Sequence, residues 1–307
     1  MGSNYRAILN CEMGVIRKEA MEVEQISLST TPVFLAKGDT VVSQGTGFFY
    51  LYLHRNLNLK FLYLVTSYHV LTGSSPSEQK PPQGDSITFQ FHRSEAVPGD
   101  IKNVHLPLFT KDEKPRWITS SSCPDADVAV IPLLNSLYNG CDIKALSPEW
   151  AEGDVKIRPA TTVTLVGYPN GFYDKTNALP VWQTGSVASE PEIDFDAKPL
   201  FLIDVSSAVP GMSGAPVFAI SYGTYQRENG SIKGEVQKFL GIYAHTSGKP
   251  RGKEKYLELE ERHGKKSGRV EYESLTIGHV WKASLIKQTL ESIDFDQYNK
   301  EILVNFM

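Results

Sequence analysis

The chain has 307 residues, of which 41% are hydrophobic and 21% are charged, and its formal net charge is −4. These values are typical of soluble globular protein arranged as one large or two small domains. The weak charge gives no reason to expect a nucleic-acid partner. No apolar run reaches the roughly 18–20 residues that span a bilayer, so we expect no membrane partner either.

Cysteine usage bears on the compartment. The chain holds three cysteines, Cys11, Cys123 and Cys141, a small and odd number that does not make a disulfide framework. None has the CxxC spacing of a zinc site, so we expect no metal. The first residues, MGSNYRAILN, lack a secretory pattern. Free thiols without an export signal predict a cytoplasmic protein.

The predicted elements are mostly strands, with one helical stretch near each end of the chain. The apolar spacing of a helix occurs at 14–26 and again at 281–293. Between them, short runs rich in Val, Ile, Phe, Tyr and Leu are bounded by turn residues, which is typical of strands. The predicted strands are 31–38, 44–53, 59–68, 86–92, 126–133, 162–169, 199–207, 215–222 and 238–245.

These strands form two groups, over about 33–134 and about 160–280, joined by a polar, turn-rich connector at 138–160. Many short strands at this spacing favour antiparallel barrels or a sandwich. A stretch dense in Lys, Arg and Glu, residues 248–274, interrupts the second group. Its low apolar content predicts a mobile surface loop. Such a loop shapes access to a site, contacts a partner, or is passive.

One serine lies in a setting that suggests chemistry. Ser213 stands between glycines in AVPGMSGAPVF, at a bend between two predicted strands. A serine hydroxyl is a weak nucleophile near neutral pH, so it needs a base to take its proton and a carboxylate to hold that base. His69 ends an apolar run where a strand gives way to a turn. Asp127 opens an alternating strand, whereas the nearby Asp125 has the setting of a turn residue.

The order His69, Asp127, Ser213 is accompanied by eight motifs spread over roughly residues 33–293. In chain order these motifs are TGFFYLYL, LVTSYHVL, DADVAVIPL, LVGYPNGF, QTGSVAS, PGMSGAPVF, FLGIYAHTSG and IGHVWKASLI. Together they resemble the chymotrypsin-like serine peptidases, and the bacterial HtrA-like branch more than the digestive trypsins. We therefore expect a bacterial protein.

The resemblance implies an all-β fold of two antiparallel six-stranded β-barrels with a C-terminal helix. The expected organisation is an N-terminal extension at 1–32, a first barrel at 33–150, a second barrel with the helix at 151–293, and a tail at 294–307.

The resemblance also implies roles for particular residues. Ser213 is expected to be the nucleophile, His69 the base, and Asp127 the carboxylate that orients the base. The N–H groups of Gly211 and Ser213 are expected to form the oxyanion hole, the pair of donors that stabilises charge on the substrate carbonyl. No cofactor is implied.

The chain departs from the digestive enzymes at the nucleophile loop. Met212 stands where trypsin-type zymogens carry an aspartate that pairs with the new N-terminus, so we do not expect activation by N-terminal insertion. Only DFDQYNKEILVNFM follows Ile293, so we do not expect the peptide-binding PDZ domain that HtrA proteins append. The site either forms on folding or is ordered by a partner or substrate.

The resemblance places the primary substrate pocket around five residues. Ser207 is expected at its base, and the residues along its wall are Tyr243, Ala244, His245 and Thr246. The absence of an acid at the base disfavours a strict Lys/Arg preference. Whether His245 recognises substrate or packs in the interior is left open.

The leading interpretation is a serine endopeptidase that cleaves protein or peptide substrates through an acyl-enzyme. The alternative is a catalytically silent, protease-like peptide-binding module, and a third is a non-enzymatic β-sandwich with chance motifs. A cytoplasmic protease must be restrained, so tight specificity and an activating protein partner both remain open.

Overall fold

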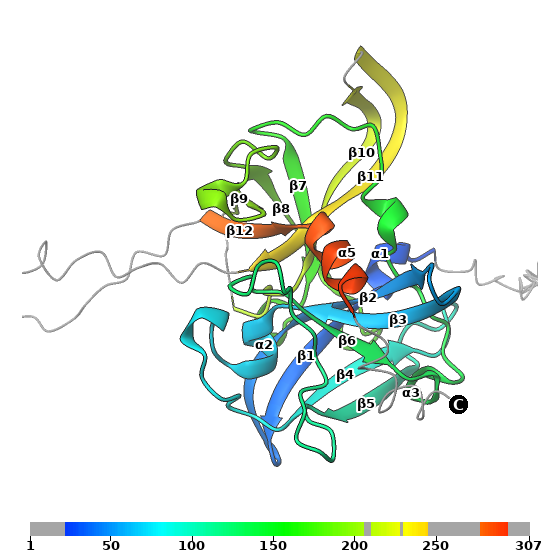
Figure 1. Cartoon of the computed structure of the whole chain (residues 1–307). Coiled ribbons are helices and arrows are strands. Elements are labelled where there is room, and N and C mark those ends of the chain that lie inside the picture. The colour runs from blue at the N-terminus through cyan, green and yellow to red at the C-terminus, as the bar shows by residue number, and fades with distance from the viewer. Residues whose placement is uncertain (1–21, 206–209, 228–229, 245–276, 294–307) are drawn as a thin grey trace, which may run out of the picture.

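The computed structural model describes residues 22–205, 210–227, 230–244 and 277–293. Figure 1 shows two β units, one above the other, with helix α5 (Ala283–Glu291) between them. Within these described ranges, no helix is both long and apolar enough to cross a membrane.

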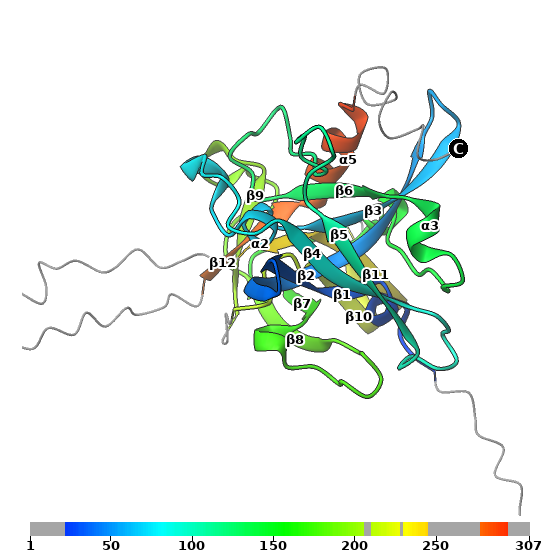
Figure 2. The same ribbon diagram turned by 90° about the horizontal axis from the view of Figure 1, so that it is seen from below.

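The first unit is a six-stranded antiparallel sheet in the order β5-β4-β1-β2-β3-β6, seen from below in Figure 2. Its strands are β1 (Thr30–Lys37), β2 (Thr40–His54), β3 (Leu59–Thr66), β4 (Ser86–His92), β5 (Ile101–Pro107) and β6 (Ala129–Leu133). Its short helices are α1 (Gln25–Leu28), α2 (Tyr68–Thr72), η1 (Pro76–Glu78) and α3 (Asn135–Tyr138).

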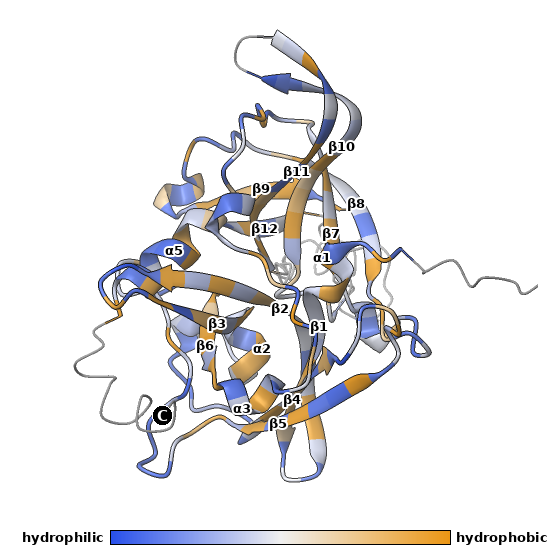
Figure 3. Ribbon diagram, turned by 90° about the vertical axis from the view of Figure 1, so that its right-hand side faces the viewer, coloured by the Kyte–Doolittle hydropathy of each residue, from blue (hydrophilic) through white to orange (hydrophobic). Residues whose placement is uncertain are grey.

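The second unit is a closed antiparallel barrel in the order β10-β11-β12-β9-β8-β7. Its strands are β7 (Thr162–Gly167), β8 (Val181–Val187), β9 (Leu200–Asp204), β10 (Pro216–Arg227), β11 (Gly230–Ala244) and β12 (Ile277–Lys282). Three 3₁₀ helices belong to its connections: η2 (Pro148–Trp150), η3 (Pro169–Gly171) and η4 (Phe195–Ala197). The β10–β11 hairpin extends beyond the barrel, and Figure 3 shows that its far end is largely hydrophilic.

Strand β2 carries consecutive apolar residues from Phe48 onward because both of its faces are buried around Phe48–Tyr50. Successive side chains of a strand point to opposite faces. Phe49 belongs to the core inside the first unit, whereas Phe48 and Tyr50 belong to a cluster that joins the two units. An alternating pattern is therefore absent from GTGFFYLYL, although the segment is a regular strand.

In the part of the chain that the structure describes, the buried hydrophobic side chains form three clusters. One lies within the first sheet and a second, including Val217 and Tyr243, lies within the barrel. The third lies between the units and takes in the apolar face of α5, where Leu285, Ile286 and Leu290 recur at helical spacing. The interface between the units is thus a hydrophobic core in its own right.

The expected fold class is confirmed: two six-stranded antiparallel β units are followed by a helix. The second unit closes as a barrel, while the first is a six-stranded sheet. The predicted domain boundaries stay a prediction. The charged stretch 248–274 lies outside the described residues.

Three elements differ from the sequence-based expectation. Strand β5 was not predicted because only Val104 in it is buried, and its pairing with β4 along its whole length forms it. The helix expected from Trp281 begins at Ala283, because Trp281 pairs with Ile242 in the barrel. Of the helix expected at 14–26, the structure describes residues from 22 onward, and there α1 begins at Gln25.

Candidate active site

Pairing between β3 and β6 brings His69 and Asp127 together. Thr66, the last residue of β3, pairs with Ala129, the first residue of β6. His69 lies three residues after the end of β3, on α2, and Asp127 lies two residues before the start of β6. In an antiparallel pair, the end of one strand lies beside the start of the other. Both residues therefore lie at the same end of the β3–β6 pair.

The Asp127 carboxylate makes two hydrogen bonds to His69. Its Oδ1 accepts the backbone N–H of His69 at 2.9 Å, and its Oδ2 lies 2.5 Å from Nδ1 of the imidazole. A carboxylate can only accept, so Nδ1 carries a proton and Nε2 of a neutral ring holds the free electron pair. This tautomer is the one that a general base requires.

Two opposing effects act on the pKa of His69. Burial lowers it, but the hydrogen bond and the negative charge of Asp127 together outweigh burial, so the pKa lies above its ordinary value of 6.5. The imidazole keeps 30% of its side-chain surface exposed. The ring therefore remains reachable from solvent while its far side is held by the carboxylate.

Sequence reasoning left Asp125 as the alternative carboxylate. The structure brings Asp127 to His69, whereas Asp125 is exposed in the loop before it. Burial distinguishes the two, because Asp127 keeps only 17% of its side-chain surface exposed.

The loop that carries Ser213 has a backbone shape that glycine makes possible. Gly211 and Gly214 have φ angles of +96° and +87°, in the region that other L-residues rarely adopt. A Cβ at Gly211 would lie 2.5 Å from the carbonyl oxygen of Tyr168, and a Cβ at Gly214 would meet the carbonyl oxygen of Thr46. Two constraints therefore require glycine at both positions. One is the positive φ angle, and the other is the close approach of another backbone segment, which leaves no space for a Cβ.

Hydrogen bonds from both units hold the Ser213 loop beside the His69 turn. The N–H of Thr46 donates to the carbonyl of Ser213 at 2.8 Å. The carbonyl of Tyr243 accepts the N–H of Gly214 at 2.8 Å and the hydroxyl of Ser67 at 3.4 Å. Ser67 is two residues before His69, so one carbonyl joins the serine loop to the histidine turn. Ser213 itself is only 4% exposed.

The two amides expected in the oxyanion hole belong to this same loop. Among the described residues, the N–H of Gly211 has no hydrogen-bond acceptor. In the peptide unit that precedes Gly211, the carbonyl of Pro210 accepts the N–H of Asn170 at 2.7 Å. This bond fixes the direction of the Gly211 amide.

The predicted pocket residues divide into two sets. Ser207, His245 and Thr246 lie outside the described residues. Tyr243 and Ala244 are described and have buried side chains, 0% and 3% exposed. Tyr243 packs in the core of the barrel, where burial raises its pKa to about 12. The assignment of these five residues to a substrate pocket stays a prediction.

Sequence reasoning passed over His279, which the fold places near the candidate triad. His279 lies on β12, opposite Ala244 of β11. Burial and the charge of Lys198 lower its pKa, while the charge of Asp127 acts in the opposite direction. His279 lies in the motif IGHVWKASLI, but its nearness to Asp127 arises only from the packing of the barrel against the first sheet.

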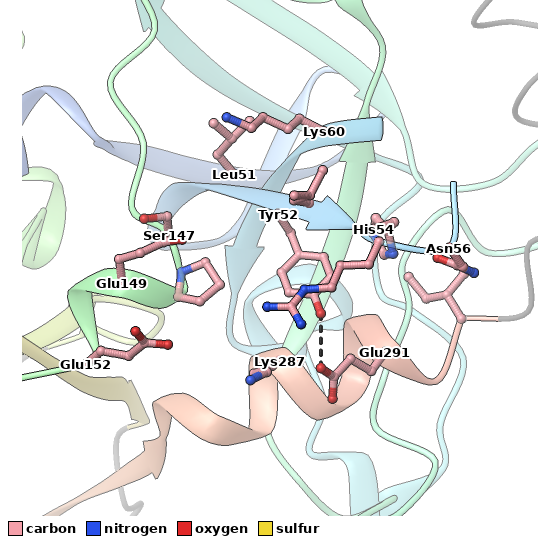
Figure 4. A pocket seen from close by; sticks show the side chains of 14 residues that line it. Leu51, Tyr52, His54, Asn56, Lys60, Ser147, Glu149, Glu152, Lys287 and Glu291 are labelled. Atoms are coloured by element: carbon pink, nitrogen blue, oxygen red, sulfur yellow. Dashed lines mark hydrogen bonds between the residues drawn. The ribbon is translucent and has the colours of Figure 1, made fainter. Parts of the chain in front are cut away.

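A pocket of about 540 Å³ lies apart from these residues, between the β2–β3 hairpin, η2 and α5. Figure 4 shows Lys287 and Glu291 reaching into it from α5, and the hydroxyl of Tyr52 donates to Oε1 of Glu291 at 3.2 Å. None of the described candidate triad residues lines it. Within the described ranges there is also no cluster of His, Cys, Asp and Glu that could hold a metal ion.

Comparison with known proteins assigns the chain to a family. Residues 45–224 match the family model described as the trypsin-like peptidase domain. No curated protein sequence matches the chain.

Three solved structures are similar to the chain at low sequence identity. The serine endoprotease from Yersinia pestis has a TM-score of 0.42 and 13% identity, over 88% of this chain and 67% of that one. The thermostable serine protease AL20 from an extremophilic microorganism has a TM-score of 0.43 and 11% identity, over 87% and 97%. A Glu endopeptidase in complex with MPD has a TM-score of 0.42 and 16% identity, over 89% and 91%.

Proposed function

The chain belongs to the trypsin-like peptidase family and is a serine endopeptidase, and from that premise we propose that it cleaves peptide bonds with a His69–Asp127–Ser213 triad through an acyl-enzyme. The proposal assigns Ser213 as nucleophile, His69 as general base and then general acid, and Asp127 as the group that fixes the imidazole tautomer.

In the first half of the proposed reaction, Oγ of Ser213 attacks the carbonyl carbon of the scissile bond while Nε2 of His69 takes the hydroxyl proton. The carbonyl oxygen becomes negatively charged and accepts hydrogen bonds from the N–H groups of Gly211 and Ser213. The imidazolium then gives its proton to the leaving nitrogen, and the C–N bond breaks. Ser213 is left joined to the acyl group by an ester.

In the second half, a water molecule attacks the ester carbonyl while Nε2 of His69 takes its proton. The same two amides stabilise the second tetrahedral intermediate. Return of the proton to Oγ of Ser213 releases the carboxylic acid product and restores the enzyme. Asp127 keeps its hydrogen bond to Nδ1 and stabilises the imidazolium that forms in each half.

The contact between His69 and Asp127 is the observation that carries the proposal. Oδ2 of Asp127 lies 2.5 Å from Nδ1 and holds the imidazole in the tautomer that a base requires, while Oδ1 accepts the backbone N–H of His69 at 2.9 Å. The serine loop adds support, because its glycines and its bonds to Thr46 and Tyr243 keep Ser213 beside the histidine turn. A passive binding module has no need of this tautomer.

A fluorophosphonate activity probe tests the proposal without knowledge of the substrate. The nucleophile attacks phosphorus, fluoride leaves, and a covalent bond to Oγ remains. We expect the full chain to be labelled, and Ser213→Ala to fold normally and remain unlabelled. A folded wild-type protein that does not react would favour the silent binding module, and equal labelling of the Ser213→Ala variant would show that another residue is the nucleophile.

We also propose a cytoplasmic, bacterial setting with protein or peptide substrates. Free Cys123 and Cys141, both partly buried, support a reducing compartment. Restraint by tight specificity or by an activating protein partner stays open. Cleavage of a defined peptide library by wild type, with Ser213→Ala as the blank, would measure the specificity directly.

A further inference from the structure

We propose that Thr46 is a positioning residue whose hydroxyl fixes the peptide geometry of the oxyanion hole. This inference rests on the proposed function and gives a role to Thr46, the first residue of TGFFYLYL, to which the resemblance assigned none. Thr46 lies on β2 of the first unit, whereas Gly211 lies in the nucleophile loop of the second. The two residues are 165 positions apart in the sequence.

The Thr46 hydroxyl makes two hydrogen bonds, and their direction is unambiguous. The backbone N–H of Tyr168 donates to Oγ1 at 3.0 Å, so the hydroxyl uses a lone pair there. Its single proton then goes to the carbonyl oxygen of Gly211 at 2.7 Å, because a carbonyl can only accept. Thr46 is fully buried, so water does not replace either bond.

These contacts hold the peptide that follows Gly211, and another holds the peptide that precedes it. The carbonyl of Pro210 accepts the N–H of Asn170 at 2.7 Å. With the planes on both sides of the Gly211 α-carbon fixed, both of its backbone dihedrals are fixed, including the φ of +96°. In a trans peptide the N–H points opposite to the carbonyl of the same unit, so the Gly211 N–H points away from Asn170.

The surroundings of the hydroxyl are shaped for it. A Cβ at Gly167 would lie 2.6 Å from Oγ1 of Thr46 and 3.1 Å from Sδ of Met212. Glycine at this position of LVGYPNGF therefore leaves the space that the hydroxyl occupies. The backbone N–H of Thr46 also donates to the carbonyl of Ser213, so one residue contacts the loop at two carbonyls.

This geometry predicts that loss of the hydroxyl frees the Gly211 peptide to turn while the triad stays intact. Thr46→Val removes the hydroxyl at nearly constant shape, and Thr46→Ser keeps it. The matched control is Thr289→Val in α5, which removes a buried hydroxyl that donates to the carbonyl of Leu285 at 2.7 Å, away from the site.

The experiment measures the second-order rate of fluorophosphonate labelling against pH, together with the melting temperature. The rate reports the oxyanion hole, because the phosphoryl oxygen gains charge as Ser213 attacks. We expect Thr46→Val to lower the plateau rate about 10- to 100-fold without moving the pH midpoint, which reports His69. Thr46→Ser and Thr289→Val are expected to react within a few-fold of wild type.

If Thr46→Val does not fold, a second variant tests the same role of Thr46. Gly167→Ala leaves Thr46 in place but puts a methyl group against its hydroxyl, and it is expected to lower the plateau in the same way. A wild-type rate in folded Thr46→Val, a shifted pH midpoint, or no recovery in Thr46→Ser would each overturn the assignment of Thr46. Failure of the wild type to react would instead overturn the proposed function, and the role of Thr46 with it.

Discussion

Among the residues through which strand β2 contacts the second unit, Thr46 and Phe48 are opposite in character. They are two positions apart, so both side chains lie on the same face of the strand. Thr46 hydrogen-bonds to the nucleophile loop, while Phe48 packs edge-on against Phe239 with the ring centroids 5.5 Å apart. One strand thus provides a polar contact at the candidate site and an apolar contact beside it.

The two contacts have different effects on the protein because their physical bases differ. Apolar burial is roughly proportional to area and has no preferred direction, so the Phe48–Phe239 contact stabilises the docking of the units. A hydrogen bond depends on distance and angle, so the Thr46 contact fixes how the loop faces the triad. Stability and catalytic geometry are therefore separable along a single strand, and substitutions on each side test this separation.

The largest effect is expected from the polar side, at Asp127. Asp127→Asn keeps the shape of the side chain but favours the wrong imidazole tautomer, and it should lower the turnover rate by about 10⁴-fold. The melting temperature should change little, because the residue is partly exposed and not part of an apolar core. Asp125→Asn is the matched control and should be close to wild type. Reversal of the two results would show that the orienting carboxylate is misassigned.

The next effect belongs to the apolar side. Phe239→Ala removes a ring that packs against both Phe48 and Phe218, and it should cost about 3–5 kcal/mol of unfolding free energy. Labelling per folded molecule should remain near wild type. Chemical denaturation measures the loss, with the exposed Tyr222→Ala on the same hairpin as control. A large loss of labelling in the folded fraction would mean that the apolar contact also sets the site.

The pH dependence sharpens the comparison further, because His69 affects activity and stability in opposite directions. The base must be neutral and its pKa is raised above 6.5, so the labelling rate should rise with pH through a midpoint above that value. A raised folded pKa contributes stability below pH 6.5 and loses it as pH climbs through the folded value. Asp127→Asn should move the midpoint down, and a wild-type midpoint at or below 6.5 would contradict the geometry.

The smallest effect is expected at Asn170, whose backbone rather than side chain makes the contact. Asn170 has a φ of +49°, and its N–H holds the carbonyl of Pro210. Asn170→Gly keeps the N–H and adopts this dihedral without strain. The unfolding free energy should therefore stay within about 0.5 kcal/mol of wild type, and the labelling rate should stay close to the wild-type rate. Asn170→Val is strained there and should slow labelling. Equal rates in the two variants would show that this turn does not govern the loop.

Much of the candidate site could be predicted from the sequence because its motifs are short and local. Each of His69, Asp127 and Ser213 lies close to the end of a strand, and strand ends are marked by composition and turn residues. Sequence reasoning also identified the β2 segment as a strand. It did not predict β5, since that strand carries one buried residue and depends on its neighbour β4 for its form.

The sequence by itself determined the all-β class, the order of the candidate triad and the need for glycine around Ser213, because alternation, turn chemistry and backbone freedom are local properties. Only the tertiary structure brought Asp127 rather than Asp125 to His69, placed His279 near that carboxylate, and joined Thr46 to Gly211. These pairings depend on strand register and on the docking of two units. Contacts between residues far apart in the chain produce no periodic pattern in the sequence, so only the tertiary structure reveals them.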